Sequence, residues 1–192
     1  MQMEDLIELA KRVQAQQAEA QTVEVKAAHR GCPSKLRDTL SSFSNQNSGG
    51  ILLFGLDENE HFTAVGVYDL QDLQKKVTEQ CNQMQPPVRA LFTTAEYEGV
   101  WICSAEIPSI AYAERPCYYI GAGIQNGSYV RVGDADRHMT DYEIYCFEAY
   151  RNHMHDDERV IERATIDFLD KDLLNAFLTE RRISRPQFAQ MN

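Results

Sequence analysis

The sequence of 192 residues lacks the marks of several large protein classes. No apolar run approaches the length of a membrane span, and the first residues, Met1-Gln2-Met3-Glu4-Asp5, have neither a basic flank nor an apolar signal core. No glycine-rich loop is followed by Gly-Lys-Ser/Thr, so a Walker A nucleotide site is excluded. We therefore expect a cytoplasmic protein with no membrane partner.

Cysteine is sparse and scattered, which argues against a zinc site. The five cysteines contain no Cys-x-x-Cys pair, and their total is odd. The five histidines also show no metal-binding spacing. We expect reduced, mostly buried thiols, with Cys32 before Pro33 as a weak candidate for a reactive one.

Basic residues are outnumbered, with 19 Lys and Arg against 29 Asp and Glu and a net charge of −10. Nearly all of the acidity lies in residues 19–150, which hold ten basic and eighteen acidic groups. Binding to nucleic acid requires local positive charge, because phosphates must be neutralised. The composition argues against a generally basic nucleic-acid-binding domain and leaves a local basic patch open.

What is present is an ordinary globular balance of 43% apolar and 25% charged residues, arranged as alternating helices and strands. Helices are predicted over residues 3–18, 34–46, from 69 to before Pro86, 140–152 and 169–180. Strands are predicted over residues 22–26, 50–56, 61–67, 88–96, 100–107, 117–120 and 128–132. The patterns predict a hairpin over residues 50–67, a second hairpin at Glu98-Gly99 and a loop over Gly121–Gly127.

This pattern predicts one packed domain over residues 1–153. Residues 154–192 are expected to form a helical appendage, which leads to a C-terminal region missing from the chain. Oligomeric state cannot be determined from the sequence, and a homo-oligomer is one open arrangement.

The central stretch from Leu40 to Asn59 joins a helix end to a buried strand through Ser48-Gly49-Gly50. A glycine-rich turn can offer backbone amides to a phosphate. The alternative is close packing where the helix meets the strand, since glycine lets two backbones approach. Both interpretations stay open.

An acidic set is formed by Glu19, Glu24 and Asp57. If their strands are neighbours, these carboxylates could hold Mg²⁺ or Mn²⁺, which prefer oxygen ligands. The alternative places Glu24 and Lys26 as paired residues on a sheet face and gives Asp57 the role of shaping a turn.

Aromatic and basic residues alternate late in the chain, at Tyr118-Tyr119, Tyr129, Arg131 and Arg137. Such residues can stack on bases and contact phosphates. The alternative is simple packing, because aromatic residues are common in strands.

The order of these segments resembles the Schlafen AlbA_2 domain, also called the divergent AAA-4 or AlbA-like DNA-binding domain. The resemblance covers roughly residues 15–150 and rests on four motifs. They are Glu19-AQTV-Glu24-Val25-Lys26, Ser42-Phe43-Ser44-Asn45, Gly49-Gly50-Ile51-Leu52-Leu53-Phe54-Gly55-Leu56-Asp57, and Tyr129-Val130-Arg131-Val132-Gly133.

The resemblance implies an α+β fold, in which a mixed β-sheet is flanked by helices and followed by a C-terminal helical extension. It also implies a DNA- or RNA-binding regulatory domain, as in bacterial transcriptional regulators. The residues expected to bind nucleic acid are Lys26, Arg30, Lys35, Arg37, Tyr129, Arg131 and Arg137, with Ser48, Gly49 and Gly50 as the phosphate turn.

Two alternative functions stay beside this non-catalytic one. Schlafen ribonucleases of the same superfamily use a Glu/Glu/Asp set, which would fall on Glu19, Glu24 and Asp57 and would bind Mg²⁺ or Mn²⁺. A third possibility is an assembly module whose acidic face binds a protein partner.

Overall fold

The computed structural model describes residues 1–152 and 165–184. The helices are α1 (Met3–Gln16), α2 (Arg37–Asn45), α3 (Leu70–Cys81), α4 (Gly123–Gly127), α5 (Asp141–Arg151) and α6 (Lys171–Ser184). The strands are β1 (Val23–Lys26), β2 (Gly50–Phe54), β3 (Leu56–Asp57), β4 (Thr63–Ala64), β5 (Met84–Gln85), β6 (Leu91–Tyr97), β7 (Val100–Ile107), β8 (Tyr118–Tyr119), β9 (Tyr129–Val132) and β10 (Ala135–His138).

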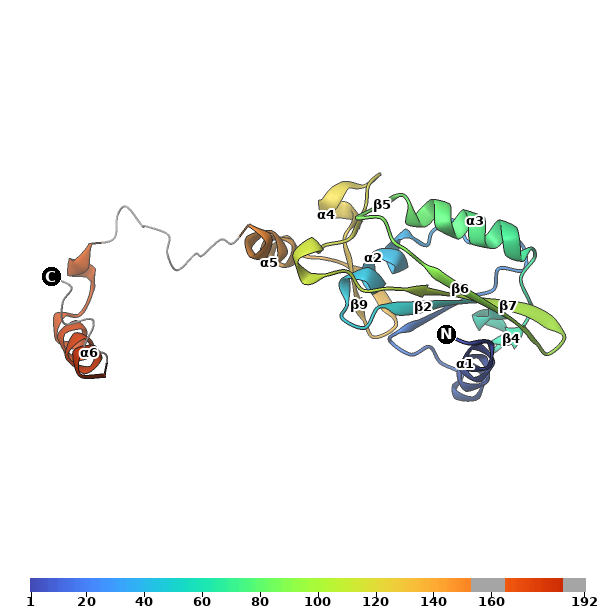
Figure 1. The fold of residues 1–192 in the computed structure, drawn as a ribbon, viewed down its shortest axis with the longest axis horizontal. Coiled ribbons are helices and arrows are strands. Elements are labelled where there is room, and N and C mark those ends of the chain that lie inside the picture. The colour runs from blue at the N-terminus through green and yellow to red at the C-terminus, as the bar shows by residue number, and fades with distance from the viewer. Residues whose placement is uncertain (153–164, 185–192) are drawn as a thin grey trace. The chain divides into compact units, whose positions relative to one another are not determined.

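A mixed four-stranded sheet in the order β1-β2-β7-β6 is the centre of the fold. Strand β1 runs parallel to β2, whereas β2–β7 and β7–β6 are antiparallel pairs. Helices lie on both faces, with α1 on one and α3 on the other (Figure 1). This arrangement confirms the predicted α+β class with its mixed sheet flanked by helices.

The two faces of the sheet bury separate apolar clusters because side chains alternate along a strand. Leu52 and Phe54 of β2 pack with α2 and α3, through residues such as Phe43 and Leu73. Leu53 lies between them in sequence and packs on the opposite face, against α1. The sheet therefore separates two apolar cores, one between the sheet and α1 and one between the sheet and α2 and α3.

Side-chain caps fix where two of the helices begin. The Asp69 carboxylate accepts a hydrogen bond from the Asp72 amide at the start of α3. At the start of α5, Thr140 and Glu143 form a capping box. These contacts satisfy amides that have no partner within the helix.

Several predicted boundaries shift, and one predicted pairing is wrong. Strand β2 pairs with β1 and β7, so the hairpin expected over residues 50–67 is limited to β3 and β4. Gly55, at φ +107°, separates β2 from β3 and packs against Ile102. Because β2 is an inner strand of the sheet, its hydrogen-bonding edges are already occupied.

Two elements between residues 121 and 138 were not predicted from the sequence. The segment expected to be a glycine loop contains the short helix α4, and residues 135–138 form β10, which pairs with β9. The hairpin at Glu98-Gly99 between β6 and β7 is confirmed, with both residues at positive φ.

The thiols follow the sequence expectation. All five cysteines are free; Cys81, Cys103 and Cys117 are buried, and the other two are half-buried. Burial raises the pKa of Cys103 and of Cys117 to about 12, so these thiols stay protonated near neutral pH. Desolvation also raises the pKa of Cys32, which opposes the prediction of a reactive thiol there.

The chain divides into two compact units, Met1–Met154 and His155–Asn192. The second unit contains the short turn Ile166–Phe168 and helix α6. The domain boundary predicted between residues 153 and 154 falls outside the described residues and stays a prediction. Within the described ranges, no helix combines the length and apolar character needed to cross a bilayer.

Candidate functional site

The side chain of Arg131 is the centre of a buried ion-pair cluster. Its Nη2 lies 2.8 Å from Glu24 Oε2 and 3.6 Å from Glu19 Oε2, and its Nη1 lies 3.0 Å from Asp136 Oδ1. The Arg131 side chain is 1% exposed. One guanidinium thus bridges three carboxylates, and we call Arg131, Glu19, Glu24 and Asp136 the Arg131 cluster.

This cluster joins three parts of the fold. Asp136 pairs with Arg131 across the β9–β10 hairpin, and its carboxylate also accepts hydrogen bonds from Ser42 Oγ at 2.6 Å and Thr39 Oγ1 at 2.7 Å. Those hydroxyls belong to α2, whereas Glu24 belongs to β1. The cluster therefore ties the hairpin to α2 and to the edge strand of the sheet.

Glu19 lies in the connector between α1 and β1 and accepts a hydrogen bond from the Val25 amide at 2.7 Å. Desolvation raises the pKa of Glu19 to about 7, and the charges of Glu24 and Glu58 act in the same direction. The Val25 hydrogen bond opposes this shift without cancelling it. Glu19 is therefore a carboxyl that can change protonation near neutral pH.

The acidic set predicted from the sequence is only partly assembled. Glu19 and Glu24 converge on Arg131, but the Asp57 carboxylate accepts from the Asn59 amide at 3.0 Å and caps the turn Glu58–Glu60. Within residues 1–152 and 165–184, no group of three His, Cys, Asp or Glu side chains could hold a metal ion. These residues do not fit Mg²⁺ or Mn²⁺, because a guanidinium already lies between the two glutamates.

The glycine turn has a packing role. A Cβ atom on Gly49 would overlap the Ile107 carbonyl oxygen, and one on Gly50 would overlap the Phe43 ring. Gly49 also has φ +65°, which side chains rarely tolerate. These contacts support the packing interpretation, in which glycine lets α2 meet β2 and β7.

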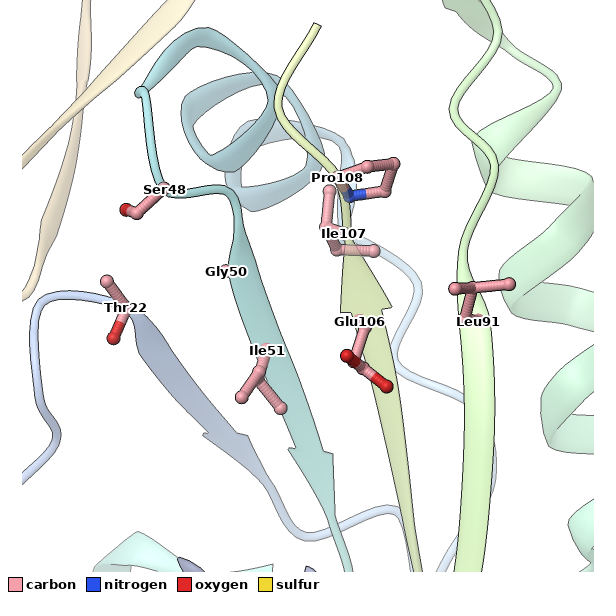
Figure 2. Close-up of a pocket in the computed structure, with 8 residues that line it drawn as sticks. All are labelled: Thr22, Ser48, Gly50, Ile51, Leu91, Glu106, Ile107 and Pro108. Atoms are coloured by element: carbon pink, nitrogen blue, oxygen red, sulfur yellow. The ribbon is translucent and has the colours of Figure 1, made fainter. Parts of the chain in front are cut away.

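The space beside this turn is poorly suited to a phosphate. Ser48, Gly50 and Glu106 line a pocket of about 360 Å³ on the sheet (Figure 2). Glu106 places a carboxylate there, paired with the Met1 ammonium at 2.7 Å. The pocket lining contains no lysine or arginine, so no cation there supports Ser48, Gly49 and Gly50 as a phosphate turn.

The basic residues predicted to bind nucleic acid have separate environments. Arg131 is buried and engaged by carboxylates, and Lys26 is paired with Glu24. Arg30, Lys35 and Arg137 are exposed. Buried Arg131 is unavailable to a phosphate, whereas the three exposed residues are accessible.

Arg37 and Tyr129 lie in a mixed aromatic and cationic surface at the start of α2. The Arg37 guanidinium lies 4.9 Å from the centre of the Tyr119 ring. Tyr129 stacks against His138 with ring centres 4.3 Å apart. Desolvation and the nearby Asp38 carboxylate raise the pKa of Tyr129, and the positive charge of Arg37 acts in the opposite direction.

We use the name α2 surface for this set, completed by an exposed neighbour of Arg37. Its members are Lys35, Arg37, Tyr119, Tyr129 and His138. Arg137 precedes His138 on β10, and neighbouring residues of a strand point to opposite faces. Arg137 is therefore exposed on the other side of the hairpin.

Two important residues had no assigned role in the sequence interpretation. Asp136 completes the Arg131 cluster, and Asn45 holds two distant segments together. Asn45 Nδ2 donates to the carbonyls of Cys117 at 2.9 Å and Tyr129 at 3.1 Å, while its Oδ1 accepts from the Cys117 amide at 2.7 Å. The signal that the sequence offered for Asn45 was its place in the motif Ser42-Phe43-Ser44-Asn45 at the end of α2.

No curated protein matches the chain. The N-terminal domain of a RecG-related protein from Nitrosomonas europaea has 22% identity and a TM-score of 0.54, over 70% of this chain and 93% of that one. This likeness shows a shared fold.

The DIP2311 protein from Corynebacterium diphtheriae has 17% identity and a TM-score of 0.48. That alignment covers 98% of this chain and 41% of the other protein. Residues 19–140 match the Schlafen AlbA_2 family, a span that begins with Glu19 and includes the Arg131 cluster and the α2 surface. The chain belongs to the Schlafen AlbA_2 family.

Proposed function

We propose that residues 19–140 form a non-catalytic nucleic-acid-binding module of a transcriptional regulator, with the α2 surface as its contact site. The observation that supports this most directly is the placement of the Arg37 guanidinium over the Tyr119 ring, 4.9 Å from its centre. Nucleic-acid sites combine cations for phosphates with aromatic faces for bases. Lys35 adds a second exposed positive charge to this surface.

The acidic charge of the chain is compatible with such a site because part of it is internal. The carboxylates of Glu24 and Asp136 are nearly buried and bound to Arg131. Their contribution to the potential at the surface is thus partly neutralised. With few exposed cations, we expect modest affinity and a clear dependence on salt.

The proposal excludes Arg131, which is buried, and Lys26, whose partner Glu24 is itself nearly buried, from the phosphate contacts. Arg30 and Arg137 stay proposed contacts outside the α2 surface because they are exposed. The five free thiols fit a reducing compartment such as the cytoplasm.

The ribonuclease alternative has weaker support. Glu19 and Glu24 share Arg131, and the Asp57 carboxylate accepts from the Asn59 amide, so all three carboxylates already have partners within the chain. The assembly module and the homo-oligomer stay predictions, and light scattering of the full chain over a range of concentrations tests both.

Fluorescence anisotropy with a labelled single-stranded 12-mer tests the proposed function. We expect affinity to fall as salt rises from about 50 mM to about 200 mM. Arg37→Ala should weaken binding and lower, by about one, the slope of the logarithm of the binding constant against the logarithm of the salt concentration. Arg12→Ala is the matched control, because Arg12 is an exposed arginine on α1, which packs on the other face of the sheet. Equal binding by the two variants would contradict the proposal.

A further inference from the structure

A second pocket, of about 330 Å³, opens between α3 and the segment that leads into α2. Its polar lining combines two cations, a carboxylate, two amides and a hydroxyl. These groups belong to Arg37, Lys76, Glu79, Gln80, Gln83 and Ser34. Because Arg37 also belongs to the α2 surface, the pocket adjoins the proposed nucleic-acid contact site.

The wall of this pocket is held in place by Gln80. Its Oε1 accepts from the Leu36 amide at 3.0 Å, and its Nε2 donates to the Pro33 carbonyl at 2.8 Å. The side chain thus fixes the segment before α2 against α3. A site held in this way loses little conformational freedom when a ligand binds.

The cations of the pocket keep the capacity to bind an anion. Arg37 Nε lies 3.7 Å from Asp38 Oδ1, too far for a hydrogen bond, and the Arg37 side chain is 40% exposed. Lys76 pairs with Asp72 at 2.7 Å and is 50% exposed. An exposed pair of this kind is weak and can exchange for a phosphate contact.

The other polar groups distinguish this pocket from a simple phosphate site. Lys76, Glu79 and Gln80 follow one face of α3 at helical spacing, and Gln83 lies in the turn after the helix. The carboxylate of Glu79 opposes a bare phosphate but accepts hydrogen bonds from the amino group of a base. The amide of Gln83 can both donate and accept.

The pocket size also favours a single nucleotide. Small-molecule sites occupy about 300–1,000 Å³, and this pocket lies at the lower end of that range. In a duplex the base edges are paired and stacked, whereas a single strand can turn a base outward into a pocket. The Arg37 guanidinium lies 4.9 Å from the centre of the Tyr119 ring, and a planar guanidinium can itself stack on a base.

We propose that this pocket holds one nucleotide of a single-stranded nucleic acid, with Arg37 and Lys76 on the phosphate and Glu79 and Gln83 on the base. The proposal rests on the proposed function and specifies its ligand. A base with an exocyclic amino group, such as cytosine, satisfies Glu79, whereas thymine has no such group. The pocket therefore selects cytosine over thymine.

The test measures binding of labelled dC12, dT12 and a 12-base-pair duplex to the full chain at pH 7.5. We expect dC12 to bind best and the duplex worst. Lys76→Ala should weaken both single strands by about tenfold through loss of a phosphate contact. Glu79→Met, which has no strong hydrogen-bond acceptor, should remove the preference for dC12 with little change in dT12 binding.

Lys75→Ala is the matched control, because Lys75 is an exposed lysine of α3 that does not line the pocket. Equal effects of Lys75→Ala and Lys76→Ala, or an unchanged dC12 preference in Glu79→Met, would overturn the pocket proposal alone. A wild-type chain that binds none of the three probes would overturn the proposed function as well.

Discussion

The Arg131 guanidinium lies 2.8 Å from the Glu24 carboxylate, although the two residues belong to strands far apart in the chain. Arg131 also reaches Asp136 at 3.0 Å and is nearly inaccessible to solvent. The contact links the motif that begins at Glu19 to the motif that begins at Tyr129. Because it is buried and ties these distant segments together, we infer a structural role for Arg131.

Replacing Arg131 tests this structural role. Arg131→Met leaves the carboxylates of Glu24 and Asp136 buried without their cation, so we expect the free energy of unfolding to fall by about 3–5 kcal/mol. Denaturant unfolding measures the change. Arg137→Ala is the control on the same hairpin and should change stability by about 0.5 kcal/mol or less, because Arg137 is exposed. If both variants change the free energy of unfolding by the same small amount, Arg131 does not stabilise the fold in this way.

Glu19 predicts a dependence of stability on pH. Its pKa rises from an ordinary value of 4.5 to about 7 in the folded chain, so the folded state holds a proton that the unfolded state has released. The contribution of Glu19 to stability is therefore largest below pH 4.5 and is lost as pH rises to about 7.

Denaturant midpoints between pH 4 and pH 8 measure this effect by comparison with Glu19→Gln. We expect the stability of the wild type relative to Glu19→Gln to decrease through this range, whereas exposed Glu8→Gln follows the wild type. Parallel curves for the wild type and Glu19→Gln would show that the Glu19 carboxyl is unperturbed.

Replacing Asn45 by aspartate should lower the stability of the fold strongly, although the two side chains have nearly the same shape. Asn45→Asp replaces the amide donor with a carboxylate oxygen that faces the carbonyls of Cys117 and Tyr129. Two lost donors and a buried charge should cost at least about 3 kcal/mol of unfolding free energy. Asn47→Asp is an exposed control in the next turn. Similar thermal midpoints for both variants would show that the hydrogen bonds of Asn45 to Cys117 and Tyr129 do not stabilise the fold.

The glycine turn can be tested in the same way. Gly50→Ala places a methyl group against the Phe43 ring, and overpacking of this kind typically costs about 1–3 kcal/mol. Ser48→Ala alters an exposed neighbour and should have little effect on stability. If Gly50→Ala leaves the unfolding midpoint unchanged, the turn does not serve packing.

Local patterns predicted local structure well. The Glu98-Gly99 turn between two strand-like runs predicted the β6–β7 hairpin, because turn chemistry and alternation act over a few residues. The buried run after Gly50 likewise predicted β2. Its pairing was missed because β1 and β7 are distant in sequence and compete with the local hairpin.

The candidate site depends on distant contacts, which explains what the sequence could not show. The sequence left open whether Glu19 and Glu24 come together around a metal, and in the structure both contact Arg131. Strand β10 had no clear alternation, so Asp136 could not be placed beside Arg131. The burial of Arg131 results from these long-range partners, and its sequence neighbours give no sign of it.

Nuclear magnetic resonance titration of the ¹⁵N-labelled chain with dC12 tests whether single-stranded DNA binds at the α2 surface and the adjoining pocket. We expect shifts centred on the backbone amides of Lys35, Arg37, Tyr119, Tyr129 and Lys76, with little change at Arg131. Shifts centred on Glu19, Glu24 and Asp57, or no shifts at saturating oligonucleotide, would contradict it.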